Sequence, residues 1–164
     1  MQRKILEIFN TLTHGVYVIG VSDQTRVNGF TASWVMQASF NPLLVVLSIN
    51  AAHTSYALLE QSGVFTINVL AKNQIEIAQH FGRPATVEKL NSVRWTKKKT
   101  GAPIIYDAIS YLECEVSHHY PSGDHVLVVG QVIDGAILNP AVEPMNYRET
   151  GEMDGSIALF PQRF

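Results

Sequence analysis

Short apolar segments, separated by turns and by few helical stretches, most limit the fold of this 164-residue chain. Apolar and β-branched runs predict strands over five ranges: 16–21, 43–49, 64–70, 111–120 and 125–133. Helical spacing is confined to three short ranges: 3–12, 56–60 and 73–81. A doubly wound parallel sheet would need long helices that alternate regularly with the strands. We therefore predict one mainly β domain over residues 1–164, a barrel or a sandwich, and barrel closure would remove exposed strand edges.

Glycine, proline and small polar residues mark the expected connections. Gly63 and Gly82 follow two of the helical segments, as C-terminal glycines do. Pro121–Asp124 predicts a hairpin turn between the last two long strands, and Asp134-Gly135 predicts a further turn. Three other ranges are expected to be turns or irregular: 23–25, 83–102 and 139–164.

Composition excludes several classes of protein. Hydrophobic residues make up 46% of the chain and charged residues 16%, which indicates an apolar surface covered by a partner subunit or a ligand. A net charge of −2 argues against nucleic-acid binding. The single cysteine, Cys114, allows no intramolecular disulfide and suits a reducing cytoplasm. Residues 1–21 make a poor signal peptide, and the longest apolar run, 43–47, is too short to span a bilayer. We therefore expect a cytoplasmic location.

The stretch NGFTASWVMQASFNP, residues 28–42, does not read as an ordinary strand. A strand buried on both faces should be continuously apolar, and a half-buried strand should alternate. This stretch instead carries small hydroxyls and amides between two apolar runs. Such residues make a poor core, so a ligand is expected to supply the missing apolar surface.

Common catalytic and metal motifs are absent, including G-x-G-x-x-G after a strand, the P-loop, H-E-x-x-H and G-x-S-x-G. His118 and His119 would point to opposite faces of a strand, so we predict no metal site. Cys114, between two glutamates, is expected to face the core as a small hydrophobic residue. Lys97–Lys99 reads as a solvated loop, with attraction of a phosphorylated ligand as the alternative.

A flat polar heterocycle with a phosphate would fit this central region. Gly29, Ala32 and Ser33 would allow close approach of the backbone to the ring. Thr54 or Ser55 is expected to cap a short helix, and the N–H groups of a helix N-terminus favour an anion. On this stretch alone, ordinary helix capping explains the same residues better than an anion site does.

The ordered set of motifs is more specific than any one of them. N-G-F-T-A-S-W-V-x-Q-A-S-F-N-P is followed by L-S-I-N, H-T-S, S-G-V-F-T-I-N-V-L, H-F-G, L-E-C-E-V and G-D-H-V-L-V-V-G-Q-V. This order, from about residue 15 to residue 147, resembles the flavin reductase-like family with an FMN-binding split barrel. It is also similar to the reductase domain of cyanobacterial flavodiiron proteins.

The resemblance implies a Greek-key split β-barrel and a homodimer that binds FMN near its interface, with FAD as a second possibility. It also implies NADH or NADPH as hydride donor and a redox partner protein as one route for the electrons. His125 matches the histidine that the family places near flavin and nicotinamide, and is the predicted catalytic residue. The positions that match flavin-binding ones are Thr31, Ala32, Ser33, Trp34, Ser39, Ser48, Ile49, Asn50, His53, Thr54, Ser55, Phe65 and Asn68.

Two positions depart from the family pattern. Trp34 stands where the family often has a second serine, and His53 stands where many members carry a basic residue before the phosphate-side threonine. The hydroxyls of Thr31 and Ser33 are expected to donate to the flavin. The predicted function is hydride transfer from NAD(P)H to flavin. The alternatives are a non-enzymatic FMN-binding electron carrier, and a barrel for another ligand such as haem or a pyridoxal phosphate compound.

Overall fold

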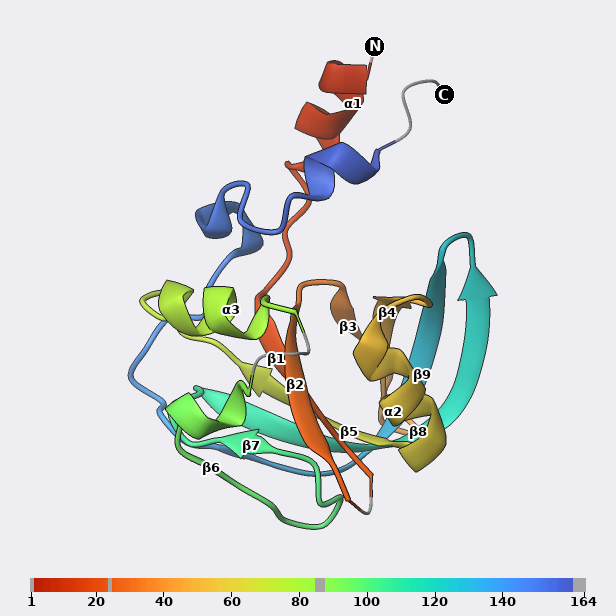
Figure 1. Cartoon of the computed structure of the whole chain (residues 1–164), viewed down its shortest axis with the longest axis vertical. Coiled ribbons are helices and arrows are strands. Elements are labelled where there is room, and N and C mark those ends of the chain that lie inside the picture. The colour runs from red at the N-terminus through yellow and green to blue at the C-terminus, as the bar shows by residue number, and fades with distance from the viewer. Residues whose placement is uncertain (1, 24, 85–87, 161–164) are drawn as a thin grey trace.

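One antiparallel sheet dominates the computed structural model, which describes residues 2–23, 25–84 and 88–160 (Figure 1). Its strand order is β2-β1-β5-β8-β9-β4-β3. The strands are β1 (Tyr17–Ser22), β2 (Val27–Ala32), β3 (Val35–Ser39), β4 (Leu44–Asn50), β5 (Val64–Val69), β8 (Ser110–Ser122) and β9 (His125–Ile137). A separate short pair joins β6 (Trp95–Thr96) to β7 (Ile104–Ile105). The predicted mainly β class is confirmed.

The two edge strands of the sheet, β2 and β3, follow one another directly in sequence. Ser33 and Trp34 alone separate them. Three Cα–Cα steps of about 3.8 Å can bridge at most about 11 Å, so the sheet must roll until its two edges approach. We call this link, residues 32–35, the seam. The seam converts an open seven-stranded sheet into a barrel that is split between β2 and β3.

Short helices lie around the barrel (Figure 1). They are α1 (Gln2–Phe9), α2 (Thr54–Ser62) and α3 (Ile75–Phe81), with the 3-10 turns η1 (Leu90–Ser92), η2 (Tyr147–Thr150) and η3 (Ser156–Leu159). α2 packs on β1 and β2 from one side, and α3 packs on the same two strands from the other. α1 stands away from the barrel beside η3. None of the helices in the described residues has the length and apolar character needed to cross a bilayer.

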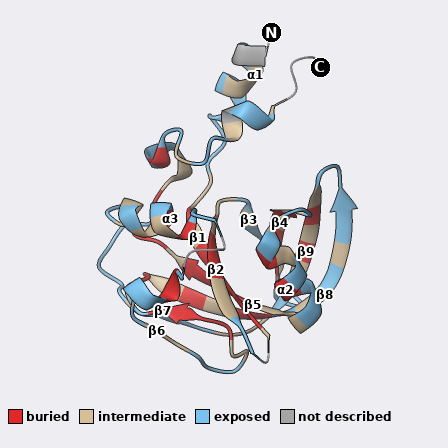
Figure 2. Cartoon of the chain, viewed as in Figure 1, coloured by how far each residue is buried: buried red, intermediate tan, exposed pale blue. Residues whose placement is uncertain are grey.

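Buried residues are concentrated in the strands of the barrel (Figure 2). The strand period of two divides this core into two clusters, one on each face of β1 and β2. Ile19 and Val21 face the barrel interior with residues such as Leu47 and Phe65. Val18 points to the opposite face, where it joins the α3 cluster. β1 is therefore buried on both faces, whereas in β2 only Gly29 and Phe30 are buried and the other residues are partly exposed.

Gly130 on β9 is required by the side chain of Phe65, which fills the barrel opposite it. A Cβ at position 130 would lie 2.5 Å from Phe65 Cζ and 3.1 Å from Cys114 Cβ. Phe65 has no exposed surface. Cys114 is buried beside it, which confirms the predicted orientation of the thiol toward the core.

The predicted turn at Asp134-Gly135 is wrong, because β9 continues through it to Ile137. Glu113 pairs with Asp134 and Cys114 with Val132, so Ile133 is the extra residue of a β-bulge. A bulge bends a strand without ending it. The hairpin before β9 is confirmed but is tighter than expected, because β8 reaches Ser122.

The other predicted elements differ from the structure mainly at their ends. α1 ends at Phe9 rather than at residue 12, and α3 begins at Ile75 rather than at residue 73. The described parts of 83–102 and 139–160 are largely irregular, as expected. Gln24 and residues 85–87 and 161–164 of the predicted turns and loops lie outside the described residues.

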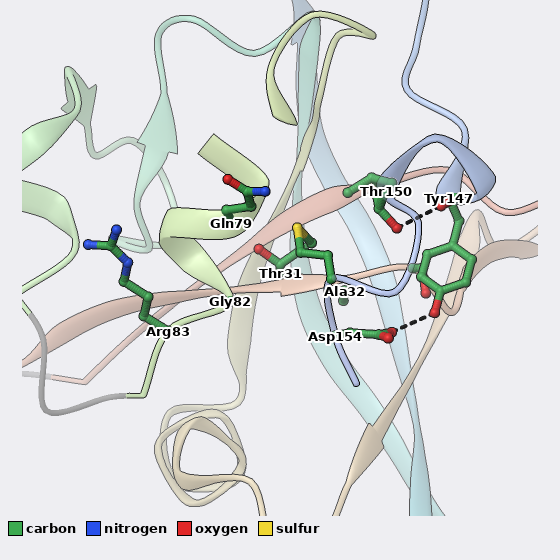
Figure 3. Close-up of a pocket in the computed structure, with 11 residues that line it drawn as sticks. Thr31, Ala32, Gln79, Gly82, Arg83, Tyr147, Thr150 and Asp154 are labelled. Carbon is green, nitrogen blue, oxygen red and sulfur yellow. Dashed lines mark hydrogen bonds between the residues drawn. The ribbon is translucent and has the colours of Figure 1, made fainter. Parts of the chain in front are cut away.

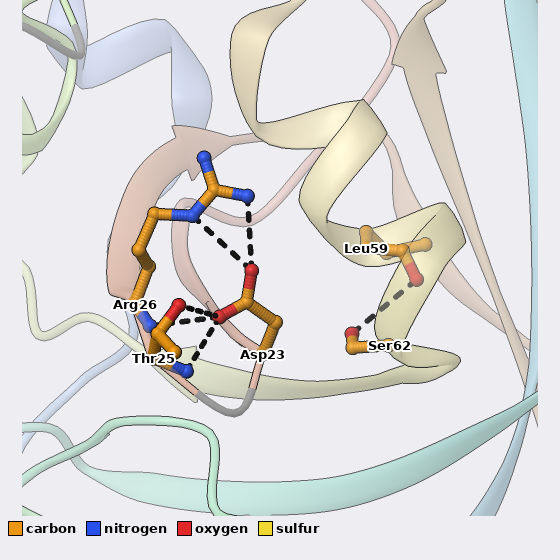
Figure 4. A network of polar contacts seen from close by, with 5 residues as sticks. All are labelled: Asp23, Thr25, Arg26, Leu59 and Ser62. Atoms are coloured by element: carbon orange, nitrogen blue, oxygen red, sulfur yellow. Dashed lines mark hydrogen bonds and ion pairs between the residues drawn. The ribbon is translucent and has the colours of Figure 1, made fainter.

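The turn that leads into β2 is fixed by one carboxylate (Figure 4). Asp23 Oδ1 accepts hydrogen bonds from the backbone N–H groups of Thr25 and Arg26, each at 2.8 Å. Its Oδ2 accepts from the Arg26 guanidinium at 2.9 Å. These bonds, led by those from the backbone, lower the pKa of the Asp23 carboxyl. The Arg26 guanidinium is thus held in the turn by its ion pair with Asp23.

The Gly130–Phe65 contact predicts a coupled pair of substitutions. Gly130→Ala should lower the free energy of unfolding by about 1–3 kcal/mol, because the added methyl overlaps the Phe65 ring. Phe65→Leu makes room, so the double variant should lose less than the sum of the two single losses. Urea denaturation checks this, with Gln131→Ala on the exposed side as control. Strict additivity would show that the two sites do not touch.

Candidate functional site

The seam opens onto a cleft of about 530 Å³, here called the seam cleft (Figure 3). Thr31, Ala32 and Ser33 form its floor. Gln79, Gly82 and Arg83, at the C-terminal end of α3, form one wall. The segment 147–154 forms the other wall. Three of the predicted ring-binding residues therefore line one real cleft.

Thr31 contributes differently from what the sequence suggested. Its hydroxyl donates to the carbonyl oxygen of Ala78 in α3 at 2.6 Å. A hydroxyl has one proton, so in this arrangement it has none left to donate to a ligand. This corrects the expected donor role: the hydroxyl binds α3 to β2, and Thr31 can serve a ligand as an acceptor or through its backbone. Ser33 is free to donate, since no partner of its hydroxyl lies among the described residues.

The C-terminal wall of the seam cleft was not found by sequence reasoning. Tyr147 donates its hydroxyl to Asp154 Oδ2 at 2.5 Å, and Thr150 donates to the Tyr147 carbonyl at 2.7 Å (Figure 3). Burial, together with Asp154, raises the pKa of the Tyr147 phenol. These residues, like Arg83, carry no short motif, and only the fold brings them to β2.

Trp34 and His125 meet at the opposite side of the seam. Their ring centroids are 4.9 Å apart with an interplanar angle of 41°. His125 Nδ1 lies 2.7 Å from Asp124 Oδ1, and because an ionised carboxylate only accepts, Nδ1 carries the proton. This contact lowers the pKa of the Asp124 carboxyl. With the proton on Nδ1, the neutral form of the ring would offer Nε2 as an acceptor. The Trp34 side chain, 48% exposed, packs against this ring.

The expected phosphate-side residues lie at the N-terminus of α2. The predicted Thr54 or Ser55 cap is wrong, because His53 is the N-cap and its Nδ1 accepts from the Ser55 N–H at 3.2 Å. His53 also packs on Phe30, with ring centroids 4.7 Å apart. Burial, and next the charge of Lys89, lower the pKa of His53. A second cleft, of about 480 Å³, lies here between β2, α2 and residues 88–91; we call it the α2 cleft.

Three of the predicted flavin-contact residues are buried in the protein interior instead. Ile49 and Phe65 are buried in the barrel core. Asn68 is buried, donates to the Val18 and Pro103 carbonyls and accepts from the Ile105 N–H, so its amide ties β5 to its neighbours. None of these three side chains lines the seam cleft or the cleft at the α2 N-terminus.

Three further predicted residues lie on β3 and β4, beyond the seam. The Ser48 N–H donates to the Trp34 carbonyl at 2.9 Å, and Asn50 lies across from His125 in the sheet register. Ser39 follows a register shift near the end of β3. Ser48 and Asn50 therefore support the Trp34–His125 side of the seam.

The basic run at 97–99 is occupied by contacts within the chain. Lys98 Nζ donates to the Tyr111 hydroxyl at 2.5 Å, and Lys99 Nζ pairs with Asp134 at 3.0 Å. Lys97 lies 5.7 Å from the centre of the Trp95 ring. These contacts favour the interpretation of the run as an ordinary surface loop.

Comparison with known proteins identifies the family. The model of the flavin reductase like domain matches residues 9–155, which is most of the chain. The chain belongs to the flavin reductase-like family. The NADH:FAD oxidoreductase of Streptomyces globisporus C-1027 superimposes with a TM-score of 0.83 at 28% identity, covering 91% of this chain and 90% of that one. The flavin reductase PheA2 superimposes with a TM-score of 0.77 at 29% identity, over 88% and 91% of the two chains. The predicted split-barrel fold is thereby confirmed.

Relatives by sequence differ in length from this flavin reductase-like chain. A probable flavin reductase of Rhizobium meliloti is 29% identical over 91% of the chain but only 47% of the relative. Putative diflavin flavoprotein A 6 of Nostoc is 34% identical over 73% of the chain and 22% of the relative. The chain thus spans about half, or less, of these relatives. An NADH-dependent FAD reductase of Streptomyces globisporus is matched over 79% of its length at 31% identity.

The His53 cap predicts a pH dependence of stability. Because the folded state lowers the pKa of His53, the unfolded chain takes up a proton first as the pH falls below about 6.5. Stability should therefore be complete above that pH and decline as the pH falls toward the folded pKa. His53→Asn keeps a capping acceptor that does not titrate. Thermal unfolding at about pH 7.5 and pH 5.5 should show a smaller decline for this variant than for the wild type. Equal declines would exclude His53 as a source.

Proposed function

We propose that this flavin reductase-like chain transfers a hydride from NADH or NADPH to a flavin whose ring lies in the seam cleft. The observation that carries the proposal is the position of Thr31–Ser33, which the seam places on the floor of that cleft. Family membership supports it, as does similarity to proteins named as NADH-dependent flavin reductases. FMN is the proposed flavin, with FAD as the alternative.

The residues of the seam cleft fit a flavin ring. Gly82, Ala32 and Ser33 leave room for a flat ligand close to the backbone. The Gly29 carbonyl points away from β1, toward the unpaired edge of β2, where it accepts a hydrogen bond from Lys89 Nζ. By strand alternation, the backbone groups of Thr31 should face the same free edge. A bound flavin supplies the redox chemistry, accepting two electrons with a proton and passing them to an acceptor or a partner protein.

The residues of the chain have to position the flavin and the nicotinamide and to stabilise the charge that develops on the ring. They need not supply a nucleophile. The Ser33 hydroxyl and the Thr31 N–H would donate toward the pyrimidine side of the ring, where negative charge develops on reduction. His125, held by Asp124 with Nε2 as acceptor, would orient a nicotinamide carboxamide near the ring. These fixed groups would hold the hydride-donating carbon of the nicotinamide and the hydride-accepting nitrogen of the flavin ring at near-attack distance, about 3–3.5 Å.

A homodimer is the proposed assembly, because β3 and its flanks expose apolar side chains next to the seam. Met36 is 63% exposed and Phe40 88% exposed, beside the half-exposed Trp34 and Leu43. A contiguous apolar edge of this kind is typical of a protein interface. A second copy bound here would also complete the wall of the site near Trp34. A cytoplasmic location is proposed from the single, unpaired thiol.

Trp34 favours one alternative, a non-enzymatic FMN-binding electron carrier of the same fold. Its indole rests on His125, at the position proposed for the nicotinamide. If the indole stays there, nicotinamide approach is slow while electron exchange with a redox protein stays fast. The reductase and the carrier therefore differ in one measurable rate.

Anaerobic titration of the flavin-loaded protein separates the two functions. NADH or NADPH should bleach the flavin absorbance within the time of catalytic turnover. Trp34→Ser should then change the rate at which the nicotinamide reduces the flavin, because the substitution uncovers His125. Bound flavin that neither nicotinamide reduces, but that a reduced redox protein does, would replace the reductase with the carrier. A protein that binds no flavin would end both.

Two substitutions test the floor of the cleft. Ser33→Ala should weaken flavin binding about 2- to 10-fold, the loss of one neutral hydrogen bond, with unchanged stability. Thr31→Val should instead lower the free energy of unfolding by about 1 kcal/mol, because it breaks the bond to Ala78. Fluorescence titration with FMN and thermal unfolding measure these effects. An unchanged flavin affinity of the Ser33→Ala variant would contradict binding of the flavin ring at the floor of the seam cleft.

A further inference from the structure

The α2 cleft contains a buried lysine whose charge is not paired. Lys89 is only 3% exposed. Its Nζ donates to the carbonyl oxygens of Phe81 at 3.0 Å and Gly29 at 3.2 Å. An ammonium has three N–H donors, so one remains. Within the described ranges, no carboxylate lies within 4 Å of this nitrogen.

Burial of an unpaired charge is costly, and such groups concentrate at binding sites. Burial indeed lowers the pKa of the Lys89 ammonium. Two carbonyl dipoles offset part of the cost, and an anion in the cleft would offset much more. The remaining charged groups on the wall do not serve this purpose: Arg26 is bound to Asp23, and Glu88 is exposed and forms no ion pair with Lys89.

The same cleft presents hydrogen-bond donors from a second element. Thr54 and Ser55, the first residues of the nine-residue helix α2, line it together with Lys89. Asn28 donates its amide to the Ser55 hydroxyl oxygen at 3.2 Å, which leaves the hydroxyl proton available. The N-terminus of a helix adds a favourable potential for an anion. A buried cation and these donors therefore converge on one space.

His53, in contrast, cannot supply the charge. Its Nδ1 accepts the Ser55 N–H, so the ring is neutral in this arrangement. The nearby charge of Lys89 also lowers the pKa of His53. Any positive charge in the α2 cleft must therefore come from another side chain.

We propose that Lys89, reaching the α2 cleft from a segment 36 positions after His53, supplies the positive charge that binds the phosphate of the flavin. The inference rests on the proposed flavin site. It assigns discrimination between phosphorylated and unphosphorylated flavins to Lys89, with Ser55 and the α2 N-terminus as the neutral donors.

Riboflavin and FMN provide the test, because they share the ring and differ in the phosphate. Lys89→Gln keeps donors for the two carbonyls but removes the charge. It should weaken FMN binding about 10- to 100-fold and leave riboflavin binding unchanged, the loss of a charge-assisted bond. Lys89→Arg should retain most of the preference for FMN. Lys4→Gln, on α1, is the control for loss of one positive charge.

The outcomes separate this proposal from the proposed function. Equal weakening of both flavins, or of neither, by Lys89→Gln would overturn the role of Lys89 while leaving the reductase standing. Wild type that binds both flavins equally would do the same. Wild type that binds neither flavin would overturn both proposals.

A measurement on wild type covers the case in which Lys89→Gln does not fold. In protein labelled with ¹⁵N at the lysine side chains, the buried ammonium of Lys89 should exchange slowly with water. Its resonance should move on addition of FMN and stay in place on addition of riboflavin. A resonance that moves equally with both flavins, or with neither, would contradict the proposal.

Discussion

The rest of the structure depends on the two-residue link between the edge strands β2 and β3. Ser33 and Trp34 must cross from one edge of a seven-stranded sheet to the other, which forces the sheet to close. The link cannot be covered by a neighbouring strand, since it is the place where the barrel is split. It therefore remains accessible: Ser33 suits that exposure, and the large Trp34 side chain stays half-exposed.

Strand β2 organises the site because α2 and α3 pack on it and no strand in the described part of the chain pairs with its second edge. Its interior face packs Phe30 into the barrel, and its outer face carries Thr31 under α3. The α2 cleft lies at its beginning and the seam cleft at its end. The five residue steps from Asn28 to Ser33 span about 16 Å in extended chain, so one elongated ligand with a ring and a charged tail could follow this edge.

Local periodicity predicted β1, β4, β5, β8 and β9 and the barrel alternative, but not β2 and β3, whose residues neither alternate nor stay apolar. The ordered motifs marked Thr31–Ser33, which line the seam cleft. The sequence did not predict that His53 caps α2, since a ring nitrogen can replace the expected Thr or Ser only in a particular backbone geometry. Asp134-Gly135 suggested a turn because this dipeptide is common in turns, but both residues pair with β8 next to the bulge at Ile133. Lys89 and Asp154 were missed because their roles depend on contacts across the fold that no spacing records.

Cys114 gives the barrel an internal reporter. It is the one cysteine of the chain, and its thiol is completely buried behind Phe65 and Gly130. Burial, with a smaller effect from Glu113, raises the pKa of the thiol to about 12. A thiol reacts as its thiolate, so modification by an external reagent requires the interior to become accessible. The rate of that modification therefore measures how often the closed barrel opens, without any introduced label.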